Sequence, residues 1–422
     1  MSATVAVEDL KVGMFVQLDG GWLSHPFPLS SFRITSAEQI TTLRSLGQPR
    51  LRWVPEKSDL PDELQAARDA QAAAEAAARA AADPAAQAQQ QRRLKLAAQR
   101  DAAQRCERQH AEAARAWREA SDAVGARPQE AGRTTEQLTR AMLDKMMCNC
   151  EIGIRLVAGG GDRAAAHALN VGVISMLIAK TLGMGGQELL DLGVGALMHD
   201  VGKGEVADRF RHAEDGFSAA ELNAYRDHVL KGVQVGRRME LSVGALKVLA
   251  QHHEHADGSG FPARQGGESV HMAARVVALV NRYDNLCNPQ SRTLALTPHE
   301  AVSVLFAQGR QRFDGAVLNA FIRMMGVYPA GSLVQLTDDR FAMVVGVNST
   351  RPLKPRVLVH DTKVPRSEAL VLDLEHVTDL GIRRSLPAAK LPAAAVEYLD
   401  PRPRVAYYFE PLNPVSDEEL AA

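Results

Sequence analysis

Cysteine is scarce in this chain, and neither sign of charge is in excess. The four cysteines form neither a CxxC pair nor a disulfide framework; they are Cys106, Cys148, Cys150 and Cys287. Free thiols in a reducing compartment are therefore expected. The 49 Lys and Arg residues nearly balance the 50 Asp and Glu residues, so the formal net charge is −1. This balance argues against a protein that holds a nucleic acid polymer by bulk positive charge.

Long apolar runs are also missing. The longest stretch, around Val171–Ala179, is far too short to cross a bilayer. The N-terminal "MSATVAVEDLKVGMF" has no basic segment ahead of an apolar run, so it does not resemble a signal peptide. We therefore expect a soluble cytoplasmic protein without membrane insertion.

Composition predicts four regions in a mainly α chain. Residues 1–56 form a small β-rich domain, in which "SFRITSAEQITTLRSLGQPRLRWV" reads as strand, helix and strand, and Ser36 with Gln39 resembles a capping box. Residues 57–133 form an Ala-rich helical linker, residues 134–330 a helical domain, and residues 331–422 a C-terminal β extension. Aromatic side chains are expected to fill the core of the first domain; they are Trp22, Phe27, Phe32 and Trp53.

The Ala-rich region has strong helix propensity but few large apolar side chains. Fourteen of the 22 residues from Gln65 to Ala86 are Ala, the best helix former, with a break expected near Pro84. Such helices can bury little, so a solvated spacer is expected. A partner helix remains an alternative, although no sustained heptad repeat supports a coiled coil.

The third region shows repeated helical periodicity. Helices are predicted over residues 134–157, 167–184, 186–200, 219–239, 243–255 and 271–288. The second of these is apolar almost all round, which indicates a buried helix. The last 90 residues change to strand-like patterns in "GSLVQLTDDRFAMVVGVN", "PRVLVHD" and "RVAYYFE".

Imidazoles and one carboxylate gather in this helical region, each at or near a helix end or on a buried-looking helix. They are His167, the pair His199-Asp200, His228 and the pair His252-His253. Imidazole and carboxylate are the usual ligands of Fe, Mn, Zn or Ni, and a carboxylate can bridge two ions. A two-metal site needs about this many ligands to clamp a phosphate. Any one histidine alone is more often packed or solvated than metal-bound.

The order of these motifs resembles the HD-GYP family of the HD phosphohydrolase superfamily. "MHDVGKGEV", then "YRDHVLKG", then "HHEHADGSGFP" follow in the family's order over about residues 140–330. The naming tripeptide GYP stands here as Gly260-Phe261-Pro262. Residues 1–56 look like the small N-terminal domain that often precedes this family.

The resemblance implies a phosphodiesterase that hydrolyses cyclic di-GMP to linear pGpG and onward to GMP. It implies two divalent transition metal ions, Fe or Mn, on His167, His199, Asp200, His228, His252, His253 and the family position held here by Asn281. Asp200 would bridge the ions. Lys203 would contact the scissile phosphate, and Arg292 is the nearest match to the family's arginine. The substrate loop would be shaped by Gly258, Gly260, Phe261 and Pro262.

Two departures from the family pattern bear on activity. Asn281 replaces an Asp ligand and brings no negative charge, so affinity for the second metal should fall; Asp284, one turn on, is better read as structural. Arg163 replaces a Glu that supports a third metal in some members. The alternatives are a degenerate member that binds cyclic di-GMP or a partner without turnover, and a hydrolase of another cyclic dinucleotide. Protein partners would bind through the N-terminal domain or the Ala-rich helices.

Overall fold

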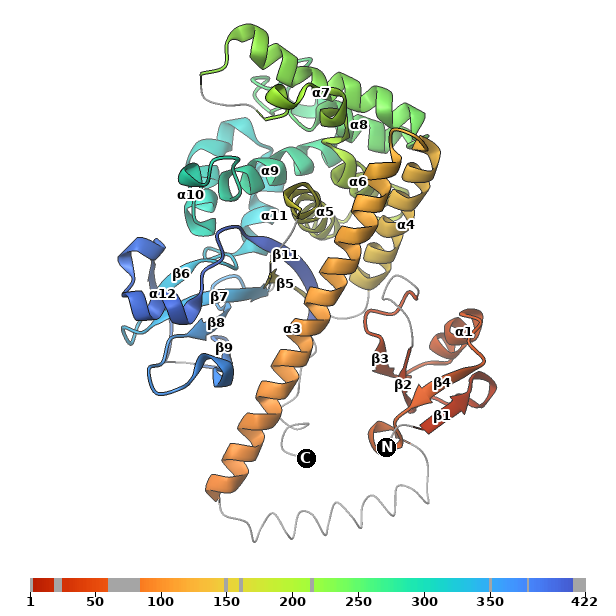
Figure 1. Ribbon diagram of the computed structural model, residues 1–422, viewed down its shortest axis with the longest axis vertical. Helices are drawn as coiled ribbons and strands as arrows, with labels where there is room; N and C mark the ends of the chain where they lie inside the picture. Colours follow the sequence, from red (N-terminus) through yellow and green to blue (C-terminus); the bar gives the residue numbers. More distant parts are fainter. Residues whose placement is uncertain are drawn as a thin grey trace. The chain divides into compact units, whose positions relative to one another are not determined.

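The computed structural model describes residues 3–18, 25–59, 84–147, 151–158, 162–212, 216–348, 351–377 and 379–412 (Figure 1). The chain divides into a unit that ends at residue 98 and a unit of residues 99–414. The fold is mainly α with one sheet near each end of the chain, which confirms the predicted class. The boundaries predicted at 56/57, 133/134 and 330/331 stay predictions.

The first unit is built around a four-stranded antiparallel sheet. The strands are β1 (Ala3–Ala6), β2 (Phe15–Gln17), β3 (Ser31–Arg33) and β4 (Arg50–Trp53), in the order β1-β4-β2-β3. Helix α1 (Ala37–Ser45) begins where the Ser36 side chain accepts a hydrogen bond from the Gln39 amide. The predicted strand, helix and strand are confirmed. Phe27 stacks on Phe32 at 4.4 Å in the core, whereas Trp22 lies outside the described residues.

In the second unit, the helices pack around one buried helix, α5 (Arg163–Thr181). They are α4 (Pro128–Met146), α5, α6 (Gly186–Met198), α7 (Ala219–Arg238), α8 (Val243–Gln251), α9 (Met272–Cys287), α10 (Pro298–Arg312) and α11 (Gly315–Met325). Helix α5 contacts α6, α9, α11 and β11, and almost every residue from Ala165 to Ala179 is buried. Its apolar sequence on all sides thus reflects a central position (Figure 1).

Helix α5 also passes a length and hydropathy test for a membrane-spanning helix. Most of the tested window is buried among the other helices, as expected for the core helix of a globular domain.

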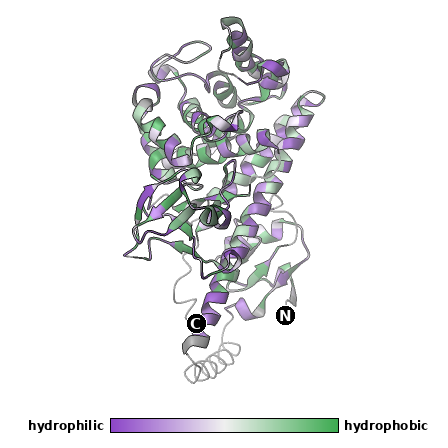
Figure 2. Ribbon diagram, turned by 60° about the vertical axis from the view of Figure 1, so that its left-hand side comes forward, coloured by the Kyte–Doolittle hydropathy of each residue, from purple (hydrophilic) through white to green (hydrophobic). Residues whose placement is uncertain are grey.

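Helix α3 (Pro84–Ala123) confirms the expected helix from Pro84 on, and hydrophilic residues recur along its length (Figure 2). Its C-terminal half differs from the solvated spacer that the sequence suggested. Ala113 and Ala120 are almost fully buried, and the end of the helix packs against Met198 and Val235. Alanine's small side chain lets the neighbouring helices approach closely, so this stretch buries surface without large apolar residues.

The second sheet joins the C-terminal strands to a strand that precedes α5. It contains β5 (Glu151–Val157), β6 (Leu333–Leu336), β7 (Phe341–Asn348), β8 (Arg356–Val359), β9 (Val371–Asp373), β10 (Ile382–Ser385) and β11 (Ala406–Leu412), with α12 (Ala393–Leu399) before β11. Strand β5 lies between β7 and β11 and pairs with β11 along its whole length. The helix predicted over 134–157 is therefore wrong beyond Met146, because residues 151–157 form this strand.

Candidate metal centre

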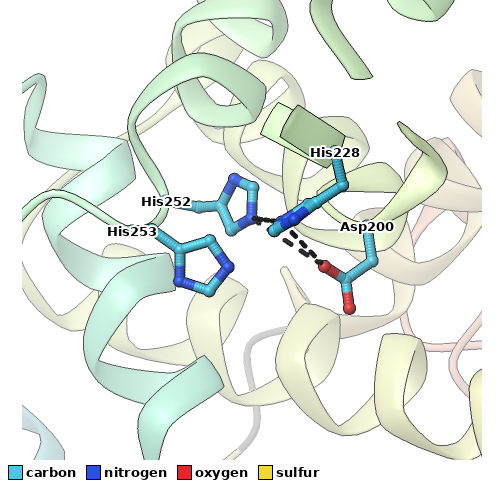
Figure 3. Close-up of side chains that lie close together, drawn as sticks. All are labelled: Asp200, His228, His252 and His253. Carbon is cyan, nitrogen blue, oxygen red and sulfur yellow. Dashed lines mark hydrogen bonds and ion pairs between the residues drawn. The ribbon is translucent and has the colours of Figure 1, made fainter. Parts of the chain in front are cut away.

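Six residues from four segments converge, with five histidines placed around one carboxylate. His167 lies on α5, His199 and Asp200 follow α6, His228 lies on α7, and His252 and His253 follow α8. Asp200 forms one group with His228, His252 and His253 (Figure 3) and a second group with His167 and His199. Within each group one ligand atom per residue lies within 4.8 Å of the others.

The two oxygens of Asp200 face different imidazoles. Oδ2 lies 3.6 Å from Nε2 of His167 and 3.5 Å from Nε2 of His199. Oδ1 lies 3.7 Å from Nε2 of His228 and 3.8 Å from Nε2 of His252. A carboxylate placed between two sets of imidazoles has the arrangement of a bridging ligand.

Backbone carbonyls orient three of these rings. Nδ1 of His199, His228 and His252 each lies against the carbonyl oxygen three residues earlier, at 2.8, 2.6 and 2.9 Å. Ala196 and Leu249 lie in the last turns of α6 and α8, where carbonyls lack helical partners and are free to accept such bonds, whereas Tyr225 lies in the interior of α7. An Nδ1 that donates to a carbonyl leaves Nε2 as the lone-pair atom that faces Asp200.

His167 is oriented by a buried carboxylate instead. Its Nδ1 lies 2.6 Å from Oδ2 of Asp284, and Oδ1 of Asp284 accepts hydrogen bonds from Asn170 at 2.7 Å and Asn288 at 2.9 Å. Asp284 therefore lies behind a candidate ligand, which agrees with the structural reading of this residue in the sequence.

The donor set fits divalent metal ions. Oδ1 of Asp200 and Nε2 of His253 are buried and have no hydrogen-bond partner among the described residues. Nε2 of His167 and Nε2 of His199 lie 3.1 Å apart, and two such atoms need a proton or a cation between them. Burial and then the neighbouring imidazoles hold the pKa of His252 well below its ordinary value, so this ring is neutral and able to ligate.

Charge within the centre favours an ionised Asp200. Burial alone would raise the pKa of Asp200, but Lys203 and then His199 hold it well below the ordinary value. Nζ of Lys203 lies 2.6 Å from Oδ2 of Asp200. The predicted contact of Lys203 with a phosphate stays a prediction.

Asn281 is buried on α9, but its described contacts are directed elsewhere. Its Oδ1 accepts a hydrogen bond from Nδ2 of Asn285 at 2.6 Å, and its carbonyl oxygen accepts from the same nitrogen at 2.9 Å. No described contact joins Asn281 to the six converging residues. Its role as a ligand stays a prediction.

The loop after His253 folds back over the centre. A Cβ on Gly260 would lie 2.4 Å from the carbonyl oxygen of His253, so only glycine fits there. Gly258 has φ +74°, a conformation that also favours glycine. The Phe261 ring stacks on His253 at 4.4 Å, and Pro262 follows through a cis peptide bond.

Glu254 holds this loop in place. Its carboxylate accepts hydrogen bonds from the amides of Ala263 at 2.7 Å and Gln265 at 3.0 Å. A backbone carbonyl already orients the neighbouring ring of His252, and the Glu254 carboxylate satisfies amides of the turn.

A cavity of about 560 Å³ opens beside His167, His199 and Asp200. Its wall includes two residues of α3, Trp117 and Ser121, and the next residue after the helix, Val124, none of which the sequence pattern assigned to the site. Nε1 of Trp117 donates a hydrogen bond of 2.8 Å to the carbonyl oxygen of Leu197, two residues before His199. No local sequence pattern in the Ala-rich segment predicts this contact, because it joins residues 80 positions apart.

Comparison with known proteins assigns the helical region. Residues 151–317 match the HD domain family. This region is an HD domain. Residues 2–134 match a domain of unknown function, DUF3391, so the predicted N-terminal domain is also confirmed. An HD domain implies a divalent metal ion, in keeping with the His and Asp cluster.

Relatives of this HD-domain protein include phosphodiesterases. A cyclic di-GMP phosphodiesterase of Pseudomonas aeruginosa is 27% identical over 384 residues, covering 88% of this chain and 89% of the relative. The cyclic di-GMP phosphodiesterase response regulator RpfG of Xanthomonas campestris is 30% identical over 153 residues, covering 36% of this chain and 40% of that protein. A solved HDG"Y"P protein, Bd1817 of Bdellovibrio bacteriovorus, has a TM-score of 0.41 and 14% identity, covering 76% of this chain and 98% of that one.

Proposed function

We propose that the chain is a metal-dependent phosphodiesterase that hydrolyses cyclic di-GMP to pGpG and onward to GMP. The observation that supports this most is Asp200, whose two oxygens face separate groups of imidazoles beside a cavity of about 560 Å³. The cyclic di-GMP phosphodiesterases among the relatives support the choice of substrate.

The residues of the centre would hold two divalent ions, Fe or Mn. His167 and His199 would bind one ion, His228, His252 and His253 the other, and Asp200 both. When bound, such ions stabilise negative charge on a phosphoryl group and supply hydroxide at neutral pH. Neutral imidazoles and thiolate-free ligation suit iron and manganese.

The surrounding side chains would bind and orient the dinucleotide. Lys203 lies against Asp200, where its ammonium group can also meet a phosphate oxygen. Phe261, stacked on His253 and held in a loop tied down by Glu254, presents an aromatic face to a base. Gly258, Gly260 and Pro262 shape that loop.

The test combines metal analysis with turnover. We expect purified protein to bind about two equivalents of transition metal and to convert cyclic di-GMP to pGpG. His199→Ala and Asp200→Ala should each abolish turnover, and activity that survives in both would contradict the proposal. Asp227→Ala, at an exposed position beside His228, is the matched control that should keep activity.

A binding-only protein is the second candidate. Asn281 favours it, because an amide adds no charge to offset two cations and its oxygen already accepts a bond from Asn285. If the wild-type protein binds cyclic di-GMP without cutting it and Asn281→Asp creates turnover, the binding-only function holds. We further propose a cytoplasmic location and signalling partners on the N-terminal domain or the Ala-rich helices.

A further inference from the structure

A smaller cavity, of about 190 Å³, continues from the metal centre. It shares Asp162, Arg163 and His167 with the larger cavity. Its other walls come from α3, from the end of α9 and from the segment that leads into β11; they include His110, Arg118, Asn288, Arg292 and Arg404. We call this the arginine cavity.

The arginine cavity concentrates positive charge. Four arginines line it against two aspartates, Asp162 and Asp284. Both carboxylates are already engaged: Asp162 caps α5 through the Ala164 amide at 2.9 Å, and Asp284 holds His167 and two asparagines. Among the described residues, no ion pair joins Arg118, Arg163 or Arg404 to a carboxylate, and Arg163 donates hydrogen bonds to Oε1 of Gln290 and to the carbonyl oxygen of Asn288. Guanidinium groups that lie together without a carboxylate partner favour an anion.

Two polar atoms on the cavity wall are buried without a partner in the part of the chain that the structure describes. Nε of Arg404 and Nε2 of His110 are both buried without a hydrogen bond among the described residues. Burial lowers the pKa of His110 to about 4, so this ring is neutral near pH 7 and offers a hydrogen bond without charge. Burial and then the charge of Arg404 lower the pKa of Arg163, and both arginines line the same cavity. A buried donor without a partner is costly unless a ligand satisfies it.

The position of Arg404 is fixed relative to the metal centre. The backbone of the next residue, Val405, donates to Oδ1 of Asn288 at 3.0 Å and accepts from Nδ2 of Asn170 at 3.1 Å and of Asn288 at 2.9 Å. The same two asparagines bind Asp284, which orients His167. A single hydrogen-bonded network therefore fixes the position of the arginine cavity relative to His167, a candidate metal ligand.

Helix α3 supplies one wall of the cavity. His110, Ala114 and Arg118 are spaced four residues apart and so lie on one face of the helix. Ala114 leaves room between the two polar side chains. This face belongs to the region that the sequence suggested was a spacer.

We propose that the arginine cavity binds a second phosphate group of the dinucleotide while the first lies at the metal centre. The inference rests on the proposed function. In the cyclic substrate this group is the other phosphodiester. In linear pGpG it is the terminal 5′-phosphate, held while the internal phosphodiester is cut by water to give two GMP molecules. Arg118, Arg163 and Arg404 would determine specificity for a ligand with two phosphates.

The test compares pGpG with GpG, which lacks the terminal phosphate, by calorimetry on metal-free full-length protein. We expect wild-type protein to bind pGpG about tenfold more tightly than GpG, because hydrogen bonds between charged groups are the strong ones. Arg404→Ala and Arg118→Ala should each remove most of this preference. Arg402→Ala and Arg115→Ala, at exposed neighbouring positions, are the matched controls and should retain it.

Turnover by metal-loaded protein gives the second readout. Arg404→Ala should raise KM for cyclic di-GMP about tenfold and change kcat little, since the arginine cavity binds rather than reacts. If both cavity variants keep the pGpG preference, or lose no more than the controls, the inference is wrong. A wild-type protein that binds metal but never cuts cyclic di-GMP would instead overturn the proposed function.

Discussion

Asp284→Asn should weaken metal binding by changing the tautomer of His167. In the native protein the Oδ1 atom of Asp284 accepts hydrogen bonds from the amide nitrogens of Asn170 and Asn288, and Oδ2 faces Nδ1 of His167 at 2.6 Å. An asparagine must place its oxygen toward the two amide nitrogens, because its own NH₂ group cannot accept. Its NH₂ then faces Nδ1 of His167 and donates to it.

The consequence falls on the opposite ring nitrogen. A neutral imidazole that accepts at Nδ1 carries its proton on Nε2, which is the atom that faces His199 and Asp200. That proton blocks ligation until it is removed. Loss of such a supporting carboxylate typically costs 10–100-fold in metal affinity or activity, or about 1.4–2.7 kcal/mol.

The assay is metal titration by calorimetry, with metal content and turnover measured on the same samples. We expect one class of site to weaken about 10–100-fold while the other is retained, because Asp284 contacts only His167 among the candidate ligands. Asp227→Asn removes the same charge at an exposed position beside His228 and serves as the control. Wild-type metal affinity in Asp284→Asn would refute the tautomer argument.

Three further predictions concern other parts of the second unit. Gly260→Ala should lower turnover at least tenfold and cost about 1–3 kcal/mol of stability, because its Cβ would clash with the His253 carbonyl oxygen; Gly315→Ala, in open space, is the control for thermal unfolding. Trp117→Phe should lose about 1 kcal/mol through the missing bond to Leu197, and an unchanged Tm would contradict this. Because burial lowers the pKa of His110 from 6.5 to about 4, the ring contributes stability that is complete above pH 6.5 and is lost as the pH falls through 4. That contribution is about 3 kcal/mol. In urea unfolding of metal-free protein, the free energy of unfolding of His110→Leu should therefore fall less between pH 6.5 and pH 4 than that of the wild-type protein.

The sequence predicted the chemistry of the centre better than its surroundings. The ligand candidates stand out because imidazole and carboxylate are unusual at the ends of apolar helices. Four of the six form the pairs His199-Asp200 and His252-His253, each directly after a helix. Asp200 could be predicted as the shared residue only through the family resemblance. Its two oxygens facing separate imidazole groups became visible in the structure.

The contacts that complete the site are long-range, and local patterns do not encode them. Residues 151–157 show helical periodicity, yet they form β5 because β7 and β11 supply partners on both sides. The burial of α3 was missed because alanine signals propensity and not packing. Trp117 and Arg118 lie in the region that the sequence predicted to be a solvated spacer, and only the folded chain shows which cavities they line.

The pairing of β11 with β5 over all seven residues has a practical consequence for anyone who dissects this chain. A fragment trimmed to residues 151–317 would leave β5 without either neighbouring strand. It would also lack Arg404 and the backbone groups to which Asn170 and Asn288 are hydrogen-bonded. Measurements on such a fragment would describe an incomplete arginine cavity, so truncated proteins should retain both α3 and β11.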